Sequence, residues 1–365
     1  DSALKSMTIP STLETVGKWA FGCENLKEIK LSDKATRIPD NLLAYLDRLE
    51  SFVVPEGITV IGNGAFAECE NLKSVTFPNT LKQIGEEAFY GCKALTQVVI
   101  PESVTTLGGG AFAGCSGLTD ITFPSTLKSI PDYAIAGCSS LTEIRIPENV
   151  TQIGKGAFER CTITEIHLPK ALTKISGYLF SSCSNLESIE IPGGVTSIGG
   201  GAFNGCEKLT EVTVPENVKS LGDSAFSYCT GLEEIRLPKT METIGEQVFR
   251  GCNRLKSVTV PYGITVIPWS AFSECSALEE LILPETVKTT ETWVFAECYS
   301  LEQVDLPEGL EEIGGKAFKD CYNLKQVTVP STLKVWGDEV FGGCSSLEEF
   351  AVHEGRGGYT VLDGV

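Results

Sequence analysis

The chain has 365 residues and a formal net charge of −19, from 48 acidic and 29 basic residues. Nucleic acids and anionic membrane surfaces attract clustered lysine and arginine, so this acidic balance argues against both as partners. Hydrophobic residues make up 42% of the chain and charged residues 21%, which is typical of a folded protein and not of a disordered one. No apolar run approaches the roughly 18 residues of a membrane span, so direct membrane insertion is not expected.

A 23-residue repeat runs through almost the whole chain. Its clearest mark is a proline column, at positions 55, 78, 101, 124, 147, 169, 192, 215, 238, 261, 284, 307 and 330. The one shorter step, from 147 to 169, reflects a residue missing just after Cys161 in "CTITEIHLP". Pro10 leads an earlier repeat, Ser32 replaces proline in the next, and His353 stands in this column in the last, partial repeat. Because no linker separates the repeats, we predict a single domain over residues 1–365, with about 15 full repeats and a partial C-terminal one.

Each repeat predicts two short extended pieces and one helical turn. The segment "LKSVTF", residues 72–77, predicts a strand that ends at Pro78, because proline cannot continue a hydrogen-bonded ladder. The segment "NTLKQIG", residues 79–85, directs Leu81 and Ile84 inward as a second extended piece. In "EEAFYGC", residues 86–92, an alanine, a phenylalanine and a cysteine are spaced for one face of a single helical turn.

A column of glycine or proline precedes the predicted helical turn. Glycine occupies it at 62, 85, 108, 154, 199 and 222, and proline at 39, 131 and 268. Proline fixes φ near −65°, so the column does not require a left-handed backbone, and we predict a helix start there. The segments "GGGAFAG" and "GGGAFNG" begin in this column and lack the Lys-Ser/Thr ending of a phosphate-binding loop, so they are interpreted as ordinary parts of the repeat.

Stacking of the repeats is required for a core. One repeat cannot bury its leucine, isoleucine, valine and phenylalanine side chains alone, whereas stacked repeats cover one another and place their strands in a parallel sheet. At about 4.8 Å per coil, about sixteen coils would form a curved rod on the order of 75 Å long.

The repeat of this chain reads L-x-x-[IV]-x-[IVLF]-P-x-x-[LV]-x-x-[IL]-G-x-x-A-F-x-x-C-x-x. It resembles the repeat of BspA-like leucine-rich repeat proteins, whose units read LxxVxIPxxVxxIGxxAFxxC. Residues 95–115, 141–161 and 209–229 match almost completely. The resemblance implies an α/β solenoid, a horseshoe or curved rod with a parallel concave β-sheet and with short strands and helical turns on its other sides. It also implies an extracellular or cell-surface setting, often bacterial, with adhesion or binding as the usual role. The ending "GGYTVLDGV" resembles the start of a variant unit, so we expect a fragment of a longer protein.

All 14 cysteines fall in one column of the repeat, at 23, 69, 92, 115, 138, 161, 183, 206, 229, 252, 275, 298, 321 and 344. Leu46 fills this column where cysteine is absent, which suits a small apolar core position and does not suit a metal ligand. No C-x-x-C pair offers a zinc site, and a parallel in-register ladder suits the Cβ geometry of disulfides poorly. We therefore predict buried free thiols and no metal site.

The sequence offers little catalytic chemistry. His167 and His353 are the two histidines, and no G-x-S-x-G motif is present. No insertion breaks the repeat to hold a catalytic group. We predict a protein without enzymatic activity and without a cofactor.

Recognition is expected where the repeat is free to vary. In the strand, the position before the last apolar residue is predicted to face the concave surface, and threonine is its commonest residue. Charged residues interrupt this column and accompany it in the neighbouring one, namely Arg145, His167, Glu190 and Arg236, with Glu143 and Glu165 beside them. This patch is a candidate site for a polar partner. The alternative is a cross-strand charge ladder that only solvates the sheet.

Aromatic residues gather in the C-terminal half. In "ETVKTTETWVFAECYS", residues 285–300, Thr290 and Glu291 replace the usual Ile-Gly pair, so one core residue is lost. The aromatic candidates around it are Tyr262, Trp269, Trp293 and Tyr299, with Tyr322 and Trp336 further on, whereas Trp19 is the one tryptophan of the first half. Such side chains can stack on sugars or anchor a protein contact. Alternatively, Trp293 packs inward to cover the missing isoleucine.

Together these features favour a non-catalytic extracellular or cell-surface module that binds a protein through its concave strand face, as in adhesion. A glycan-binding module that uses the aromatic residues and a structural spacer in a larger surface protein are the alternatives. The expected partner is a protein or glycan on a host or neighbouring cell surface.

Overall fold

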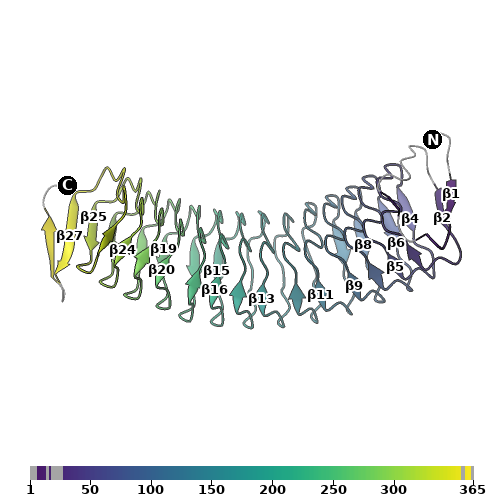
Figure 1. Cartoon of the computed structure of the whole chain (residues 1–365), viewed down its shortest axis with the longest axis horizontal. Helices are drawn as coiled ribbons and strands as arrows, with labels where there is room; N and C mark the ends of the chain where they lie inside the picture. The colour runs from purple at the N-terminus through teal and green to yellow at the C-terminus, as the bar shows by residue number, and fades with distance from the viewer. Residues whose placement is uncertain (1–5, 14–15, 18–27, 355–357, 363–365) are drawn as a thin grey trace. The chain divides into compact units, whose positions relative to one another are not determined.

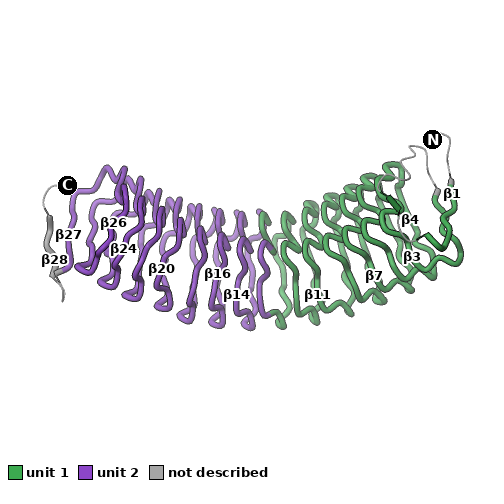
Figure 2. Tube along the Cα trace, in the orientation of Figure 1, with its two compact units in different colours: residues 1–172, 179–183 green, residues 173–178, 184–365 purple. Residues whose placement is uncertain are grey.

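The computed structural model describes residues 6–13, 16–17, 28–354 and 358–362 (Figure 1). Trp19 and Cys23 lie outside these residues. The chain divides into two compact units, unit 1 with residues 1–172 and 179–183, and unit 2 with residues 173–178 and 184–365 (Figure 2). Each unit is a stack of coils in a parallel-strand β-solenoid, and the prediction of a single domain stays a prediction.

One series of strands precedes the proline column, apart from β27, which runs one residue past His353, and we call these the face strands. In unit 1 they are β1 (Ser6–Ile9), β2 (Glu28–Leu31), β4 (Ser51–Val53), β6 (Ser74–Thr76), β8 (Gln97–Val99) and β10 (Asp120–Thr122). In unit 2 they are β15 (Glu211–Thr213), β17 (Glu234–Arg236), β19 (Ser257–Thr259), β21 (Glu280–Ile282), β23 (Gln303–Asp305), β25 (Gln326–Val329) and β27 (Glu349–Glu354). They pair in parallel and in register, with Phe52 opposite Val75, for example, and β28 (Gly358–Leu362) then pairs antiparallel with β27.

A second series of strands, two residues each, forms on another side of the coils, and we call these the back strands. In unit 1 they are β3 (Arg37–Ile38), β5 (Val60–Ile61), β7 (Gln83–Ile84), β9 (Thr106–Leu107), β11 (Ser129–Ile130) and β12 (Gln152–Ile153). In unit 2 they are β13 (Lys174–Ile175), β14 (Ser197–Ile198), β16 (Ser220–Leu221), β18 (Thr243–Ile244), β20 (Val266–Ile267), β22 (Thr289–Thr290), β24 (Glu312–Ile313) and β26 (Val335–Trp336). All their pairings are parallel, in the orders β3-β5-β7-β9, β11-β12, β13-β14-β16-β18 and β20-β22-β24-β26.

The third part of each coil, which we call the turn segment, contains no helix in the part of the chain that the structure describes, so the predicted helical turns are wrong. In residues 62–69 the N–H groups of Ala65 and Ala67 donate to carbonyls three residues earlier, whereas those of Phe66 and Glu68 donate to carbonyls of the next coil. The φ angle is positive at Gly64 (59°) and at Glu68 (58°). A right-handed helix needs negative φ throughout and its N–H groups bonded within the segment, so this alternating pattern forms linked turns.

The glycine column before each turn segment reflects a close approach between coils. A Cβ atom built on Gly62 would lie 2.3 Å from Oδ1 and 2.7 Å from the backbone nitrogen of Asp40, in the preceding coil. Gly62 is not among the residues with positive φ, so the prediction that this column needs no left-handed backbone is confirmed. Glycine is therefore favoured here by the narrow space between the coils, and not by the backbone φ angle.

Identical side chains of successive coils stack to make the core. In unit 1 the ring of Phe89 lies parallel to those of Phe66 and Phe112, with centroids 4.8 and 5.1 Å away. In unit 2 the stack runs from Phe203 to Phe341, with neighbouring centroids between 5.1 and 5.8 Å apart. Offset-stacked aromatic pairs are favourable at these separations. Where phenylalanine fills this column, the stack joins successive coils through a large side chain, whereas Ile135 takes its place between Phe112 and Phe158.

The cysteines form a second ladder beside the phenylalanines. Those from Cys69 to Cys321 are buried and free, and Cys344 is half-buried, which confirms the prediction of buried thiols. The Sγ of Cys229 donates to the carbonyl of Phe203 in the preceding coil, at 3.1 Å. Burial raises the pKa of Cys229 and of Cys275 to about 12. These two thiols therefore stay protonated in the folded state at neutral pH.

Thr290 interrupts the isoleucines of the back strands. It pairs with Ile267 on one side and Ile313 on the other. Its side chain is 1% exposed, and its Oγ1 has no hydrogen-bond partner. Trp293 does not fill the place of an isoleucine, because it lies half-buried in the turn segment with the Nζ of Lys316 4.9 Å from its ring centroid. The coil therefore keeps an unsatisfied hydroxyl in its core.

Thr290→Val is expected to stabilise unit 2 by about 1–2 kcal/mol, because valine has the same shape and removes the buried hydroxyl that lacks a partner. Urea unfolding at neutral pH measures the change. Thr243→Val, at an exposed back-strand position, is the control and should change stability by less than about 0.5 kcal/mol. A loss of stability in Thr290→Val would show that the hydroxyl has a partner in solution.

Candidate binding surface

The outward positions of the face strands carry the charged candidates. In strands such as β17 the middle residue is buried, and the first and third are exposed. Arg236 of β17 is exposed, and its Nε lies 2.7 Å from Oε1 of Glu234 on the same strand. In unit 1 the Nε of Arg145 lies 3.0 Å from Oε1 of Glu143 in the same way, and 87% of the Arg145 side chain is exposed. These ion pairs run along one coil, so they differ from a ladder of charges across coils.

The remaining charged candidates are exposed in both units. His167 of unit 1 is 88% exposed, and its Nε2 lies 3.8 Å from Oε1 of Glu165. Glu190 of unit 2 is exposed. The candidate set therefore divides between the units, with Arg145, His167 and their glutamates in unit 1, and Glu190 and Arg236 in unit 2.

The series of face strands is interrupted where several of these charged residues lie. Between Thr122 and Glu211, where every residue is described, the face positions carry one isolated bridge, from Thr122 to Arg145, and no assigned strand. The repeat with the missing residue after Cys161 falls in this interval. Removal of a residue from one coil shifts its register against its neighbours, which accounts for a weakened ladder.

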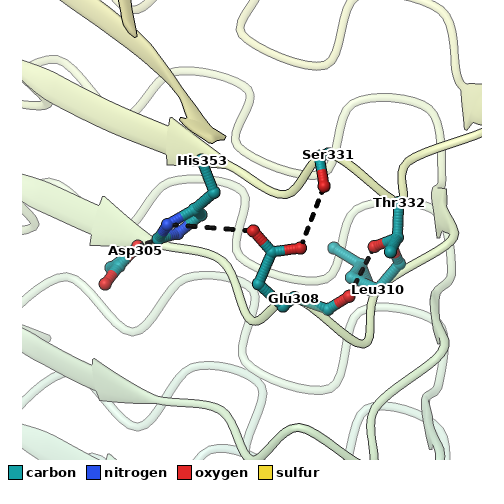
Figure 3. Close-up of polar contacts among 6 residues, drawn as sticks. All are labelled: Asp305, Glu308, Leu310, Ser331, Thr332 and His353. Carbon is teal, nitrogen blue, oxygen red and sulfur yellow. Dashed lines mark hydrogen bonds and ion pairs between the residues drawn. The ribbon is translucent and has the colours of Figure 1, made fainter. Parts of the chain in front are cut away.

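A polar cluster on the last face strands was missed by sequence reasoning (Figure 3). The Nε2 of His353, from β27, lies 2.9 Å from Oδ1 of Asp305, from β23. The Nδ1 of the same ring lies 4.0 Å from Oε1 of Glu308, whose Oε2 accepts a hydrogen bond from Ser331 at 3.2 Å. The available signal was a histidine in the proline column, but its acidic partners come from a coil two repeats earlier.

Two neighbouring hollows lie on the face strands of unit 2. The first, of about 340 Å³, is lined by outward residues of three strands, including Glu280, Ile282, Gln303, Asp305, Gln326 and Thr328. The second, of about 600 Å³, shares Gln303 and Gln326 and adds the ion pair of Lys325 with Glu302. Ile282 is 46% exposed among these polar groups. An exposed apolar side chain with a polar rim is therefore built into this face.

The four aromatic candidates do not form a single platform. Tyr262 follows the proline column and is 70% exposed, whereas Trp269 and Trp293 belong to turn segments. Tyr299 stacks on Tyr322 with centroids 5.4 Å apart, and its hydroxyl donates to Glu297, which raises the pKa of Tyr299 to about 12. Among the described residues, no ring contact joins any two of the four candidates.

Metal-binding clusters and membrane-spanning helices are absent from the described ranges. No three or more histidine, cysteine, aspartate or glutamate side chains there are grouped so that they could hold a metal ion. Within those ranges, no helix is both long and apolar enough to span a bilayer.

Parallel coils, a proline after most face strands and stacked core ladders define the chain as a leucine-rich-repeat solenoid. The model of the BspA type leucine-rich repeat region matches residues 1–119, 108–233 and 219–348. The chain belongs to this family.

Solved structures of bacterial proteins share the fold. A leucine-rich repeat protein from Bacteroides ovatus is 30% identical, with a TM-score of 0.72, over 95% of this chain and 86% of that one. A leucine-rich repeat protein from Eubacterium ventriosum is 23% identical, with a TM-score of 0.50, over 97% and 95% of the two chains. No curated protein sequence matches the chain.

Proposed function

We propose that the chain is a non-catalytic module of a bacterial cell-surface protein that binds a protein partner through its face strands. The observation that carries this proposal is the hollowed face of unit 2, where the exposed Ile282 is surrounded by carboxamide and carboxylate groups. An apolar centre within a polar rim is the usual composition of a protein interface. The BspA-type family and the net charge of −19 support an extracellular setting.

Among the charged candidates, those of unit 2 would contribute to the rim of this surface. Arg236 lies on a face strand of the same unit, whereas Arg145 and His167 belong to unit 1. Rim charges mainly affect the association rate and the choice of partner, so we assign them a role in specificity. A protein partner fits better than a glycan, because the four aromatic candidates lack the shared platform on which sugar rings stack.

An array of host proteins and glycans, probed with the parent chain and variants, tests the proposal. Ile282→Asp should weaken binding to the protein hits by about thirtyfold or more, as truncation of a central interface residue does. Aspartate is tolerated in this column at Asp305, so the fold should persist. Arg236→Glu should have a smaller effect that grows as salt is lowered.

The matched control is Val266→Asp, which changes a similarly exposed residue on a back strand of the same unit. Binding that is lost equally in Val266→Asp and Ile282→Asp would contradict a face-strand site. Hits confined to glycans, with binding lost in Tyr299→Ala, would replace this proposal by the glycan-binding one.

A further inference from the structure

The turn segments of unit 1 carry a groove that is separate from the face strands. Its volume is about 580 Å³, and turn segments of four successive coils line it, from Glu86 to Arg160. Pockets that hold small ligands commonly measure about 300–1,000 Å³. The groove is therefore large enough for an extended side chain and part of its backbone.

The groove exists because one coil has almost no side chains at its outer positions. In residues 108–115 these positions are Gly109, Gly110, Ala113 and Gly114. The coil before places Glu86, Glu87 and Tyr90 there, and the coil after places Asp132 and Tyr133. The φ angles of Gly110 (60°) and Gly114 (73°) also favour glycine over a residue with a side chain. The "GGGAFAG" segment, which conforms to the repeat, thus forms the floor of the groove.

The walls of the groove are acidic and aromatic. Four carboxylates, from Glu86, Glu87, Asp132 and Glu159, face one guanidinium, from Arg160, which leaves a formal charge of −3. The Nε of Arg160 lies 3.7 Å from Oε1 of Glu159, whereas Glu86 and Glu87 form no ion pair within the described part of the chain. Tyr90 and Tyr133, on the coils that flank the glycine-rich one, are 41% and 37% exposed.

The groove also offers free hydrogen-bond donors. At this position of the turn segment, the backbone N–H of Lys155 donates to Oδ1 of Asp132 in the preceding coil, at 2.7 Å. The N–H of Asp132 itself would need an acceptor on Gly109, which has no side chain. In the described structure the N–H groups of Gly109 and Asp132 have no protein acceptor. Both residues line the groove together with the carboxylates.

We propose that this groove binds a lysine- or arginine-bearing segment of a protein partner. The cationic side chain would lie among the carboxylates of Glu86, Glu87 and Asp132, for which the described residues provide no ion pair. The tyrosine rings add a cation–π contact, and the free N–H groups can bond a backbone carbonyl of the segment. Charge complementarity favours this ligand over a neutral sugar, for which the net charge of −3 offers no advantage. The groove does not include the face strands. Failure of this proposal would therefore leave the function proposed above unaffected, and the reverse also holds.

A peptide of alternating lysine and glycine, acetylated and amidated, tests the proposal by calorimetry and by NMR shifts of the Gly109 and Asp132 amides. We expect binding that weakens severalfold between about 20 and about 300 mM NaCl. Glu86→Gln with Glu87→Gln should weaken it about tenfold. Gln247 occupies the Glu87 column with a φ of 54°, so the fold accepts glutamine there. Ala113→Tyr, which copies Tyr90 from the same column, should fill the groove and abolish binding.

Matched variants separate the groove from net charge. Glu187→Gln with Glu246→Gln removes the same charge at exposed positions of unit 2, and Ala67→Tyr adds the same ring outside the groove. Both should bind the peptide as the parent chain does. Equal weakening in these controls, unchanged binding in Ala113→Tyr, or amide shifts caused by maltotriose and not by the peptide would each overturn the proposal.

Discussion

Raising the pH from about 8 to about 10 is expected to unfold both units steeply. In an unfolded chain a cysteine thiol ionises near pH 8.5. In the folded chain the pKa of ten cysteines is raised, five in each unit: Cys69, Cys92, Cys138, Cys161 and Cys183, and Cys229, Cys252, Cys275, Cys298 and Cys321. Burial is the main cause for eight of them, whereas for Cys92 and Cys321 the hydrogen bond with the neighbouring cysteine, Cys115 or Cys344, comes first and burial second. Above pH 8.5 the folded state therefore holds more protons than the unfolded state. The free energy of unfolding then falls as the pH rises.

The size of the effect follows from the number of thiols. At pH 10 the unfolded state gains about 2 kcal/mol from the ionisation of each thiol, while the buried thiol stays protonated. Five thiols in one unit amount to about 10 kcal/mol, which is comparable with the whole stability of an ordinary domain, about 5–15 kcal/mol. The cysteine ladder stabilises the core at neutral pH and limits its stability at alkaline pH.

Urea unfolding at several pH values, in the presence of a reducing agent, measures this dependence. The matched variant replaces Cys229, Cys252 and Cys275 by alanine. It should be less stable than the parent at pH 7, because small cavities replace the sulfur atoms. Its loss between pH 8 and pH 10 should nevertheless be smaller than the parent's by about 6 kcal/mol. An equal loss in both proteins would show that other groups cause alkaline unfolding.

The core was predictable because each repeat places the same residue in the same column. Leu46 in the cysteine column indicated a packing position before any geometry was known, and Sγ atoms bonded to carbonyls of the preceding coil agree with it. The lost core isoleucine at Thr290 was equally visible. The position of Trp293 could not be predicted, because the same sequence is compatible with a half-buried tryptophan in the turn segment and with a tryptophan in the core.

The turn segments were predicted wrongly for a local reason. The spacing of Ala88, Phe89 and Cys92 fits one face of a helical turn and also fits a series of linked turns. The angle that decides between them, a positive φ, occurs at Glu87 (52°) and at Gln247 (54°), which carry no glycine signal. Bonds to the next coil supply the stabilisation that holds these residues in the left-handed region.

The candidate sites depended on different kinds of information. Residues such as Arg145 and Arg236 could be assigned to an exposed face, because alternation along a strand is a local property. The groove of unit 1 could not be predicted from the sequence. Its floor exists because one coil lacks side chains at positions where the coils on either side have them. The contact of His353 with Asp305 was also hidden, because it joins residues two coils apart.

Replacement of Phe272 by alanine is expected to destabilise unit 2 by about 4 kcal/mol, as removal of a buried aromatic side chain typically does. Its side chain is fully buried, and its ring lies between those of Phe249 and Phe295, with centroids 5.4 and 5.6 Å away. In a stack of repeats each coil is stabilised by its neighbours, so one cavity weakens the interfaces on both sides. Urea unfolding gives the change in stability, and limited proteolysis should cleave first near the altered coil.

Tyr322→Ala separates the effect of burial from that of ring stacking. Tyr322 stacks on Tyr299 with centroids 5.4 Å apart, which is the distance of Phe272 from Phe249, but Tyr322 is 48% exposed. Stacking adds about 0.5–1.5 kcal/mol beyond burial, so this variant should lose about 1 kcal/mol. If both variants lost the same free energy, ring stacking would hold the coils together; the larger loss in Phe272→Ala assigns that role to burial.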